Sequence, residues 1–455
     1  MEIKETIESL TPEMLEKLAR LVKYNSERGE ALPGKPFGEG PAAVLAEGLA
    51  IAKEMGFDTV NMDNYCGYAE MGEGKDIIAI AAHLDIVPAG EGWDTDPFTL
   101  TEKDGFVFGR GVSDDKGAVI ASLYAMKLVK ESGIPMSKRV RLLMGCAEET
   151  GSECMQHYVE KEGAPSCGFT PDGNFPGIHG EKGMMAMTAH SKNTKILSMN
   201  GGFVTNAVCS RCVTKIAAAD VNPEALQEAL GNSPLVNWFV SEEEGVLTID
   251  ATGVSAHAST PLLGVNAAGE TMKALAAAGM QDDFVDFYNS RIGTACDGEG
   301  LGLKVSDEYG PLTLNNGIVK TENGEITCTL DLRCLATRPT DELRALCAPY
   351  LEDEKGFITI GSVVQPLFYP ADSALVQNLY QAYVDVTGDM EHKPEVIGGG
   401  TYAKAVPGII AFGCEFPDPD NHIHDANERL RIEELKQQVL IYVKAIENLL
   451  AADTL

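Results

Sequence analysis

Short apolar runs that end in polar residues dominate the first 180 positions of the chain. The run at residues 77–82 leads directly into His83 and Asp85, and a second run at residues 139–147 leads into two glutamates. Short continuous apolar runs are typical of strands buried on both faces. Side chains alternate along a strand, so His83 and Asp85 should lie on the same side of the backbone. Polar residues at the carboxyl ends of such strands lie where open α/β sheets bind ligands.

Segments with helical character separate these runs. Apolar and Ala/Leu-rich stretches predict helices at residues 41–55 and 118–130. Thr11 and Pro12 predict the start of an N-terminal helix, with threonine as N-cap and proline at the first helical position. Strands that alternate with helices are typical of α/β domains, so we expect a mostly parallel central sheet.

The pattern changes after residue 183. Short strands are predicted at 184–190, 208–217 and 246–253, a helix at 266–278, and a hairpin around Asn323–Gly324. The α/β pattern returns near residue 384 and ends in an amphipathic helix. We therefore expect a discontinuous α/β domain, residues 1–182 and 384–455, with an α+β domain inserted at residues 183–383. Two domains also suit a chain of 455 residues.

Composition argues against several classes of partner. The chain carries 36 Lys and Arg against 68 Asp and Glu, a net charge of −32. This charge favours solubility and repels nucleic acids and anionic membranes. The N-terminus has no basic segment followed by an apolar one, and no apolar run reaches the ~18 residues of a membrane helix. We expect neither nucleic acid nor membrane as a partner.

The eleven cysteines have no spacing that indicates a disulfide framework. A reducing cytoplasm is therefore the expected location. Cys209 and Cys212 form the only C-x-x-C pair, and no second pair completes a zinc site with them. The flanking residues are typical of a strand, so we interpret this pair as structural.

Carboxylates and imidazoles follow the predicted strands and turns. The candidates are His83, Asp114, Glu149, Asp172 and His424, with Glu148 as a further acid. Each one alone has a simpler interpretation, as a solvated or packed histidine or as an exposed acidic strand end. Together they would be costly to bury unless a cation compensates their charge. A two-metal hydrolytic site needs such N and O ligands, a bridging carboxylate and a further carboxylate that accepts a proton from water.

These residues lie in motifs that resemble the M20 metallopeptidases. The motifs are H-x-D-x-V-P at residues 83–88, G-R-G-x-x-D-D-K-G at 109–117, E-E-T-G-S at 148–152 and H-x-x-N-E at 424–428. The segments F-T-P-D-x-x-F-P at 169–176, E-K-G at 181–183 and G-G-G-T-Y-A at 398–403 are similar to the dipeptidase V branch. The resemblance spans nearly the whole chain in the same order. It implies a zinc-peptidase-like catalytic domain and an inserted lid domain.

The resemblance also implies a set of metal ligands. His83 and Asp172 would hold one zinc ion, Glu149 and His424 the other, and Asp114 would bridge them. Asp85 would accept the second ring N–H of His83 and so set its tautomer. The resemblance further implies a cis peptide bond between residues 114 and 115.

Glu148 would be the general base that activates the bridging water and then protonates the leaving amine. In the inserted domain, His257 would donate to the developing oxyanion, Asn206 would contact the substrate, and Arg333 would bind its C-terminal carboxylate. A strand at residues 326–333 places Arg333 on the open face, where a salt bridge with Asp331 is the alternative. The chain departs from the branch at Cys209 and Cys334, which weakens the substrate assignment more than the metal assignment.

We therefore expect a cytoplasmic, metal-dependent dipeptidase, with two divalent ions, expected to be Zn²⁺, that acts on short peptides with a free C-terminal carboxylate. The large lid of the dipeptidase V branch mimics a second subunit, so a monomer is expected. One alternative is an M20 amidohydrolase that deacylates N-acyl amino acids, which would use the same metal site. The other is a non-catalytic binding protein with the same fold.

Overall fold

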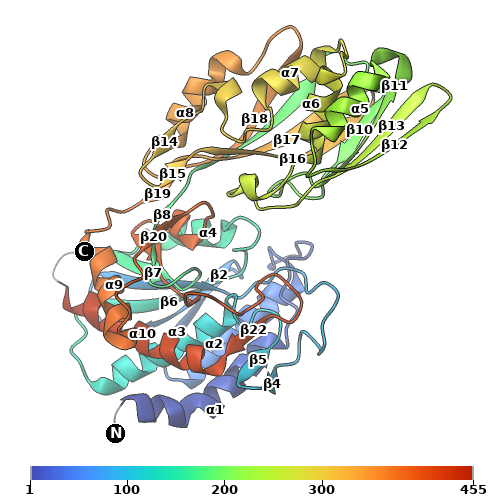
Figure 1. Ribbon diagram of the computed structural model, residues 1–455. Helices are drawn as coiled ribbons and strands as arrows, with labels where there is room; N and C mark the ends of the chain where they lie inside the picture. The colour runs from blue at the N-terminus through green and yellow to red at the C-terminus, as the bar shows by residue number, and fades with distance from the viewer. Residues whose placement is uncertain (1–2, 453–455) are drawn as a thin grey trace. The chain divides into compact units, whose positions relative to one another are not determined.

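The computed structural model describes residues 3–452. The chain divides into two compact units (Figure 1). Unit 1 comprises Met1–Gly180 and Tyr369–Leu455, and unit 2 comprises Glu181–Phe368. The second stretch of unit 1 begins earlier in the sequence than the expected boundary at residue 384. Residues 374–387 form a helix, α9 (Ala374–Thr387), that packs against the C-terminal helix of unit 1.

The central sheet of unit 1 is mixed. Its strands, in spatial order, are β1 (Asp58–Met62), β2 (Cys66–Met71), β6 (Arg139–Gly145), β3 (Ile77–His83), β7 (Cys167–Thr170), β21 (Ile409–Ala411), β8 (Ile178–Glu181) and β19 (Leu367–Phe368), with β20 (Glu395–Ile397) also paired to β8. The four strands β6, β3, β7 and β21 are parallel to one another. Antiparallel strands flank them on both sides. The expected α/β fold is confirmed, and the parallel arrangement holds for the centre of the sheet.

The predicted burial of the central strand is confirmed. Every residue of β3 is buried, as its continuous apolar sequence indicates. His83 is the last residue of β3, and Glu148 and Glu149 follow the end of β6. Asp172 follows the end of β7. Because these three strands are parallel, their carboxyl ends lie at the same edge of the sheet, where ligands bind in open α/β folds.

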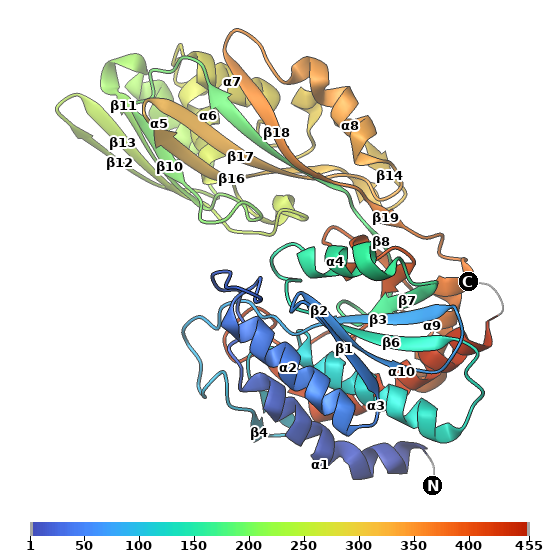
Figure 2. The same cartoon turned by 180° about the vertical axis from the view of Figure 1, so that it is seen from behind.

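Helices cover both faces of this sheet. They are α1 (Ile3–Val22), α2 (Glu39–Glu54), α3 (Lys116–Ser132), α4 (Glu153–Glu162), α9 and α10 (Ile432–Ala451), with the short 3-10 helix η5 (Tyr402–Lys404). Both views show α3 and α10 on one side of the sheet and α4 on the other (Figures 1 and 2). A separate sheet of β4 (Thr101–Lys103), β5 (Phe106–Phe108) and β22 (Arg429–Arg431) joins segments far apart in the sequence.

The prediction that Thr11 and Pro12 begin the first helix is wrong. Helix α1 starts at Ile3 and passes through both residues. Its buried side chains include Ile7, Met14 and Leu18, so the apolar stripe that packs against the unit begins before the proline. Burial of this stripe outweighs the loss of one backbone hydrogen bond at proline.

Unit 2 is built on an antiparallel sheet. Its strands, in spatial order, are β12 (Asn237–Glu243), β13 (Val246–Thr252), β11 (Arg211–Ala217), β10 (Ser198–Gly201), β16 (Thr313–Glu322), β17 (Glu325–Arg333), β9 (Met184–Ser191) and β18 (Gly356–Val364). The helices are α5 (Pro223–Gly231), α6 (Ala267–Ala277), α7 (Asp283–Arg291) and α8 (Thr340–Cys347). Shorter elements are β14 (Ser306–Asp307), β15 (Gly310–Pro311), η1 (Ala218–Asp220), η2 (Pro261–Leu263), η3 (Glu299–Leu301) and η4 (Ala348–Tyr350). The predicted hairpin is confirmed by the pairing of β16 with β17.

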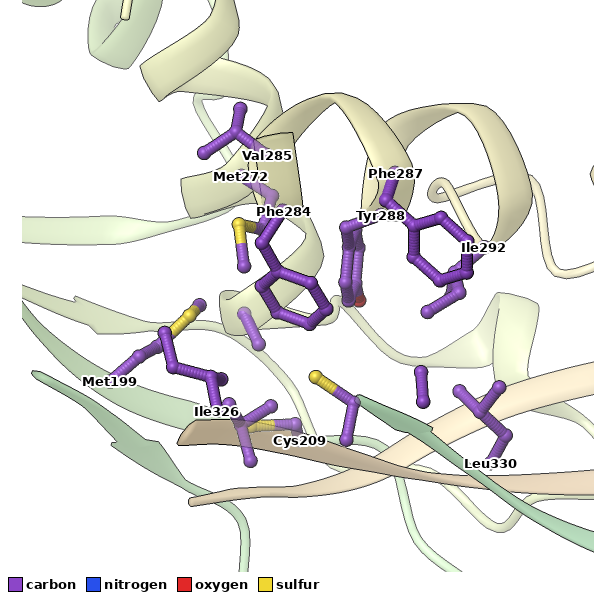
Figure 3. Close-up of a cluster of buried hydrophobic side chains, with 14 of the residues drawn as sticks. Met199, Cys209, Met272, Phe284, Val285, Phe287, Tyr288, Ile292, Ile326 and Leu330 are labelled. Atoms are coloured by element: carbon purple, nitrogen blue, oxygen red, sulfur yellow. The ribbon is translucent and has the colours of Figure 1, made fainter. Parts of the chain in front are cut away.

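The core of unit 2 lies between this sheet and its helices. Phe284 and Tyr288 of α7 point toward Ile326 and Leu330 of β17 (Figure 3). Along β17 the apolar residues are buried and their neighbours through Asp331 are more exposed, so the predicted alternation is confirmed. This alternation directs residue 331 to the face opposite the core.

The close pairing of β3 with β7 leaves no room for a side chain at Gly168. A Cβ atom on Gly168 would lie 1.9 Å from the carbonyl oxygen of Ala79, a backbone atom that cannot rotate away. We expect Gly168→Ala to lower the free energy of unfolding by at least about 2 kcal/mol, as overpacking does. Chemical denaturation measures the change. Gly29→Ala is the control, because its Cβ would come no closer than 3.9 Å to another residue. Equal losses in the two variants would contradict this account.

Candidate metal centre

The Asp114 carboxylate lies between two histidine rings in unit 1. Its Oδ1 is 2.8 Å from Nε2 of His83, and its Oδ2 is 2.9 Å from Nε2 of His424. Nε2 of His424 is also 3.3 Å from Oε1 of Glu149. One carboxylate therefore offers a separate oxygen to each imidazole, the arrangement that a carboxylate bridging two ions requires.

The six candidate residues of unit 1 come together, although they are far apart in the sequence. One potential ligand atom from each of His83, Asp114 and Glu149 lies within 4.8 Å of the others. A second such group consists of His83, Glu148 and Asp172. Nitrogen and carboxylate oxygen ligands of this kind suit zinc and related divalent ions. The donor set therefore fits a metal site.

Hydrogen bonds hold the first histidine and the two glutamates in place. Nδ1 of His83 lies 3.0 Å from the backbone carbonyl oxygen of Asp85, and a carbonyl can only accept. Nδ1 therefore carries a proton. The expected acceptor was the Asp85 carboxylate, but this lies farther away, at 3.5 Å. Its two oxygens instead accept the backbone N–H groups of Glu148 and Glu149, each at 3.1 Å.

Charge in this cluster is unevenly balanced. Burial lowers the pKa of His83, but the nearby carboxylates of Asp114 and Asp85 outweigh burial and raise it. Hydrogen bonds to Asp114 and then Glu149 raise the pKa of His424 to about 10. Burial, and then the Asp172 carboxylate, raise the pKa of Glu148 well above its usual range. The two histidines and Glu148 thus favour their protonated forms, and for Glu148 this is the usual response of a buried acid beside another carboxylate.

Two residues beside His83 were not assigned by sequence reasoning. The Asp115 carboxylate accepts the backbone N–H of His83 at 3.1 Å. The ring of Tyr402 packs edge-on against the His83 ring at 6.2 Å, and its hydroxyl lies 3.0 Å from Sγ of Cys154. Asp115 lies in the motif at residues 109–117 and Tyr402 in the motif at residues 398–403. These motifs indicated that the segments belong to the site, but not which contacts they make. The Asp114–Asp115 peptide bond is cis, as the resemblance implied.

Unit 2 brings its three candidate residues into one region. The backbone of Ala258, next to His257, donates to the carbonyl of Asn206 at 2.9 Å. The carbonyl of Ala258 accepts from the hydroxyl of Thr313, which pairs with Arg333 between β16 and β17. Residues from three separate segments therefore lie close together at one end of the sheet.

The tautomer of His257 follows from its contacts. The backbone N–H of Ser259 donates to Nδ1 of His257 at 3.2 Å, and the Ser259 hydroxyl, which can also donate, lies 2.7 Å from the same nitrogen. Nδ1 is then an acceptor, so the proton of the neutral ring is on Nε2. Burial, and then the charge of Arg333, lower the pKa of His257. The lowered pKa favours the neutral form of the ring, which in this tautomer would donate through Nε2.

Arg333 forms the salt bridge that was its alternative interpretation. Its Nε and Nη2 donate to the two oxygens of Asp331 at 2.8 and 2.9 Å. Its Nη1 contacts Sδ of Met184, and the residue is 6% exposed. A ligand carboxylate at this guanidinium would compete with Asp331.

Comparison with known proteins identifies the family. The sequence model of Peptidase family M20/M25/M40 matches residues 79–448. The chain belongs to this family. A Staphylococcus haemolyticus protein named "Putative dipeptidase SH1171" is 31% identical over 98% of this chain and 99% of its own length. "Putative dipeptidase YtjP" of Bacillus subtilis is 32% identical over 94% of this chain and 95% of its own length. The expected M20 membership is confirmed.

Solved structures of the family share the fold. Human carnosine dipeptidase 1 aligns with a TM-score of 0.58 at 16% identity, over 99% of this chain and 98% of its own. The M20 metallo-carboxypeptidase Sso-CP2 of Sulfolobus solfataricus gives the same TM-score and identity, over 97% of this chain and 100% of its own. M20 peptidases are metal-dependent, so this chain is an M20-type metallopeptidase, and unit 1 contains two groups of side chains that could hold a metal ion. Among residues 3–452, no helix has the length and apolar character needed to cross a membrane.

The contacts of Asp85 generate a prediction for the site. In Asp85→Asn an amide N–H₂ would face one of the two backbone N–H groups and leave it without an acceptor. We expect a loss of about 1–3 kcal/mol in the free energy of unfolding, measured by chemical denaturation. Asp96→Asn is the control, since Asp96 also accepts a backbone N–H, from Phe98, but is exposed to water. A loss no larger at residue 85 than at residue 96 would refute the role of this carboxylate.

Proposed function

We propose that this protein is a metal-dependent dipeptidase that hydrolyses short peptides with a free C-terminal carboxylate. The observation that carries the proposal is the Asp114 carboxylate, with one oxygen facing each of two histidines. Membership of the M20 family and the similarity to proteins named as putative dipeptidases support the reaction and the substrate class.

The proposed cofactor is a pair of divalent ions, with zinc the ion of choice. His83 and Asp172 would hold one, Glu149 and His424 the other, and Asp114 would bridge them. When bound, such a pair acts as a Lewis acid on the scissile carbonyl and makes water a nucleophile at neutral pH. The close approach of His424 to both Asp114 and Glu149 supports this division of the ligands.

Glu148 is the proposed general base. Its carboxyl lies in one group with His83 and Asp172, and burial raises its pKa. A carboxylate of raised pKa accepts a proton from water more readily and can return it to the leaving amine. Asp85 would position this base, because it accepts the backbone N–H of Glu148.

Unit 2 is proposed to supply substrate contacts. His257, as a neutral Nε2–H donor, would stabilise the oxyanion that develops on the carbonyl. Asn206 would contact the peptide, and Arg333 would exchange part of its pairing with Asp331 for the substrate's carboxylate. Their proximity within unit 2 and the family resemblance support these roles.

A monomer in the cytoplasm completes the proposal. The eleven cysteines, ten of them buried, are all free thiols, which suits a reducing compartment. The large inserted segment supports a monomer through its resemblance to the dipeptidase V branch.

A substrate panel tests the proposed activity. The zinc-loaded protein is expected to hydrolyse unmodified dipeptides faster than tripeptides, C-terminally amidated dipeptides and N-acetyl amino acids. A chelator should abolish hydrolysis, and added Zn²⁺ should restore it. Release of amino acids, measured by mass spectrometry, gives the rates. Preference for N-acetyl amino acids would replace the proposal with a deacylase, and equal rates on amidated dipeptides would remove carboxylate recognition.

Glu148→Gln tests the general base. We expect kcat to fall by at least about 10²-fold, because no group of suitable pKa would remain to move the proton. Zinc content, measured by elemental analysis, should stay at the wild-type value. Glu153→Gln, on the exposed start of α4, is the matched control and should retain both. Loss of zinc together with activity would make Glu148 a metal ligand instead.

A further inference from the structure

A buried ion pair lies beside the candidate metal centre and has no role in the mechanism above. Nη1 of Arg110 donates to Oε2 of Glu428 at 2.8 Å, and the side chains are 2% and 1% exposed. Arg110 precedes Asp114 by four residues, and Glu428 follows His424 by four residues. The pair thus joins two segments that each carry a candidate metal ligand.

The Glu428 carboxylate also organises the backbone around Asp114. Its Oε2 accepts the N–H of Gly111 at 2.9 Å. Its Oε1 accepts the N–H groups of Ser113 at 2.9 Å and of Asp114 itself at 3.1 Å. With Arg110, each carboxylate oxygen receives two donors, and successive backbone N–H groups form an anion-binding nest around it. A shift of this carboxylate would move the backbone of Asp114 directly.

Arg110 extends the connection to a third segment. Its Nη2 donates to the carbonyl oxygens of Pro88 and Ala89, both at 3.2 Å. Its guanidinium lies over the ring of Trp93 at 5.3 Å, and Nε1 of Trp93 donates to the carbonyl of Ala89. These residues follow His83 and Asp85 in the sequence. The ion pair therefore contacts the segments that carry His83, Asp114 and His424.

We propose that Glu428 and Arg110 form a positioning pair that holds Asp114 between the two histidines and so sets the affinity of the centre for its metal ions. The inference rests on the proposed function only in that the centre binds metal. A buried ion pair contributes little net stability compared with apolar residues of similar size. Outer contacts that orient metal ligands, by contrast, commonly change metal affinity or activity by about 10–100-fold.

Glu428→Gln tests the pair. In the wild type, each carboxylate oxygen of Glu428 accepts two donors. The glutamine amide would keep one oxygen as an acceptor, but its N–H₂ group would face the two donors that bind the other oxygen. We expect the Kd for Zn²⁺, measured by competition with a chromogenic chelator, to rise about 10–100-fold. The increase in Tm caused by Zn²⁺ should shrink, and kcat on a dipeptide should fall more than KM rises.

The matched control is Glu162→Gln on α4. Glu162 accepts from Nη1 of Arg141 at 2.9 Å, and this arginine side chain is 1% exposed, so the variant also removes an acidic partner of a buried arginine. Arg141 lies within β6, and neither Arg141 nor Glu162 belongs to the loops that carry Asp114 and His424. Its Kd for Zn²⁺ should equal that of the wild type.

The outcomes separate this inference from the proposed function. Unchanged Kd for Zn²⁺ in Glu428→Gln, or equal losses in Glu428→Gln and Glu162→Gln, would overturn the positioning role alone. A wild-type protein that binds no metal would overturn both proposals, whereas metal binding without dipeptide hydrolysis would overturn only the dipeptidase assignment.

If Glu428→Gln does not fold, Arg110→Lys decides by the same measurement, because lysine keeps the charge but cannot bind both Glu428 and the carbonyls of residues 88 and 89. Wild-type affinity in Arg110→Lys would then refute the pair.

Discussion

Negative charge held away from water is the constraint on which the unit 1 site depends. Hydrogen bonds to His424 and then His83 lower the pKa of Asp114 against the effect of burial, and the hydrogen bond to Asp114 raises the pKa of His83. Glu148 behaves in the opposite way, since burial raises its pKa. Environments that separate the pKa values of neighbouring acids are how active sites divide roles between them. Here the division separates the proposed bridging carboxylate from the proposed base.

The fold meets this constraint at the edge where parallel strands end. Strands β3, β6 and β7 carry His83, Glu148, Glu149 and Asp172 to that edge, and backbone hydrogen bonds between the strands fix their spacing. Asp114 and His424 lie on loops, which lack such a framework. Glu428 connects these two loops, because its carboxylate binds the backbone of the Asp114 loop and the residue itself belongs to the His424 loop. The site is therefore assembled partly by the sheet and partly by one buried carboxylate.

In unit 2 the candidate residues are positioned by contacts of a different kind. Main-chain hydrogen bonds between adjacent segments bring Asn206 next to His257, and strand pairing brings Arg333 close to both. The contact between Ser259 and Nδ1 then leaves the ring of His257 as a donor through Nε2. Arg333 is already paired with Asp331, so substrate binding there would be an exchange of partners.

The sequence alone determined the features that depend on local patterns. The apolar run of β3 indicated a strand buried on both faces, and the alternation along β17 indicated which side chains face the core. Residue type and order also identified the acids and histidines that the structure brings together in unit 1. Burial and periodicity are properties of neighbouring residues, so they can be read without knowledge of the fold.

Only the tertiary structure decided which distant groups meet. The sequence did not show that α1 continues through Pro12, that α9 packs with unit 1, that the Asp85 carboxylate binds the backbone of residues 148 and 149, or that Glu428 meets Arg110. Each of these contacts depends on packing between segments that lie apart along the chain or on the burial of a whole helix. The residues next to a side chain in the sequence do not reveal its partner, because the partner depends on how the intervening chain folds.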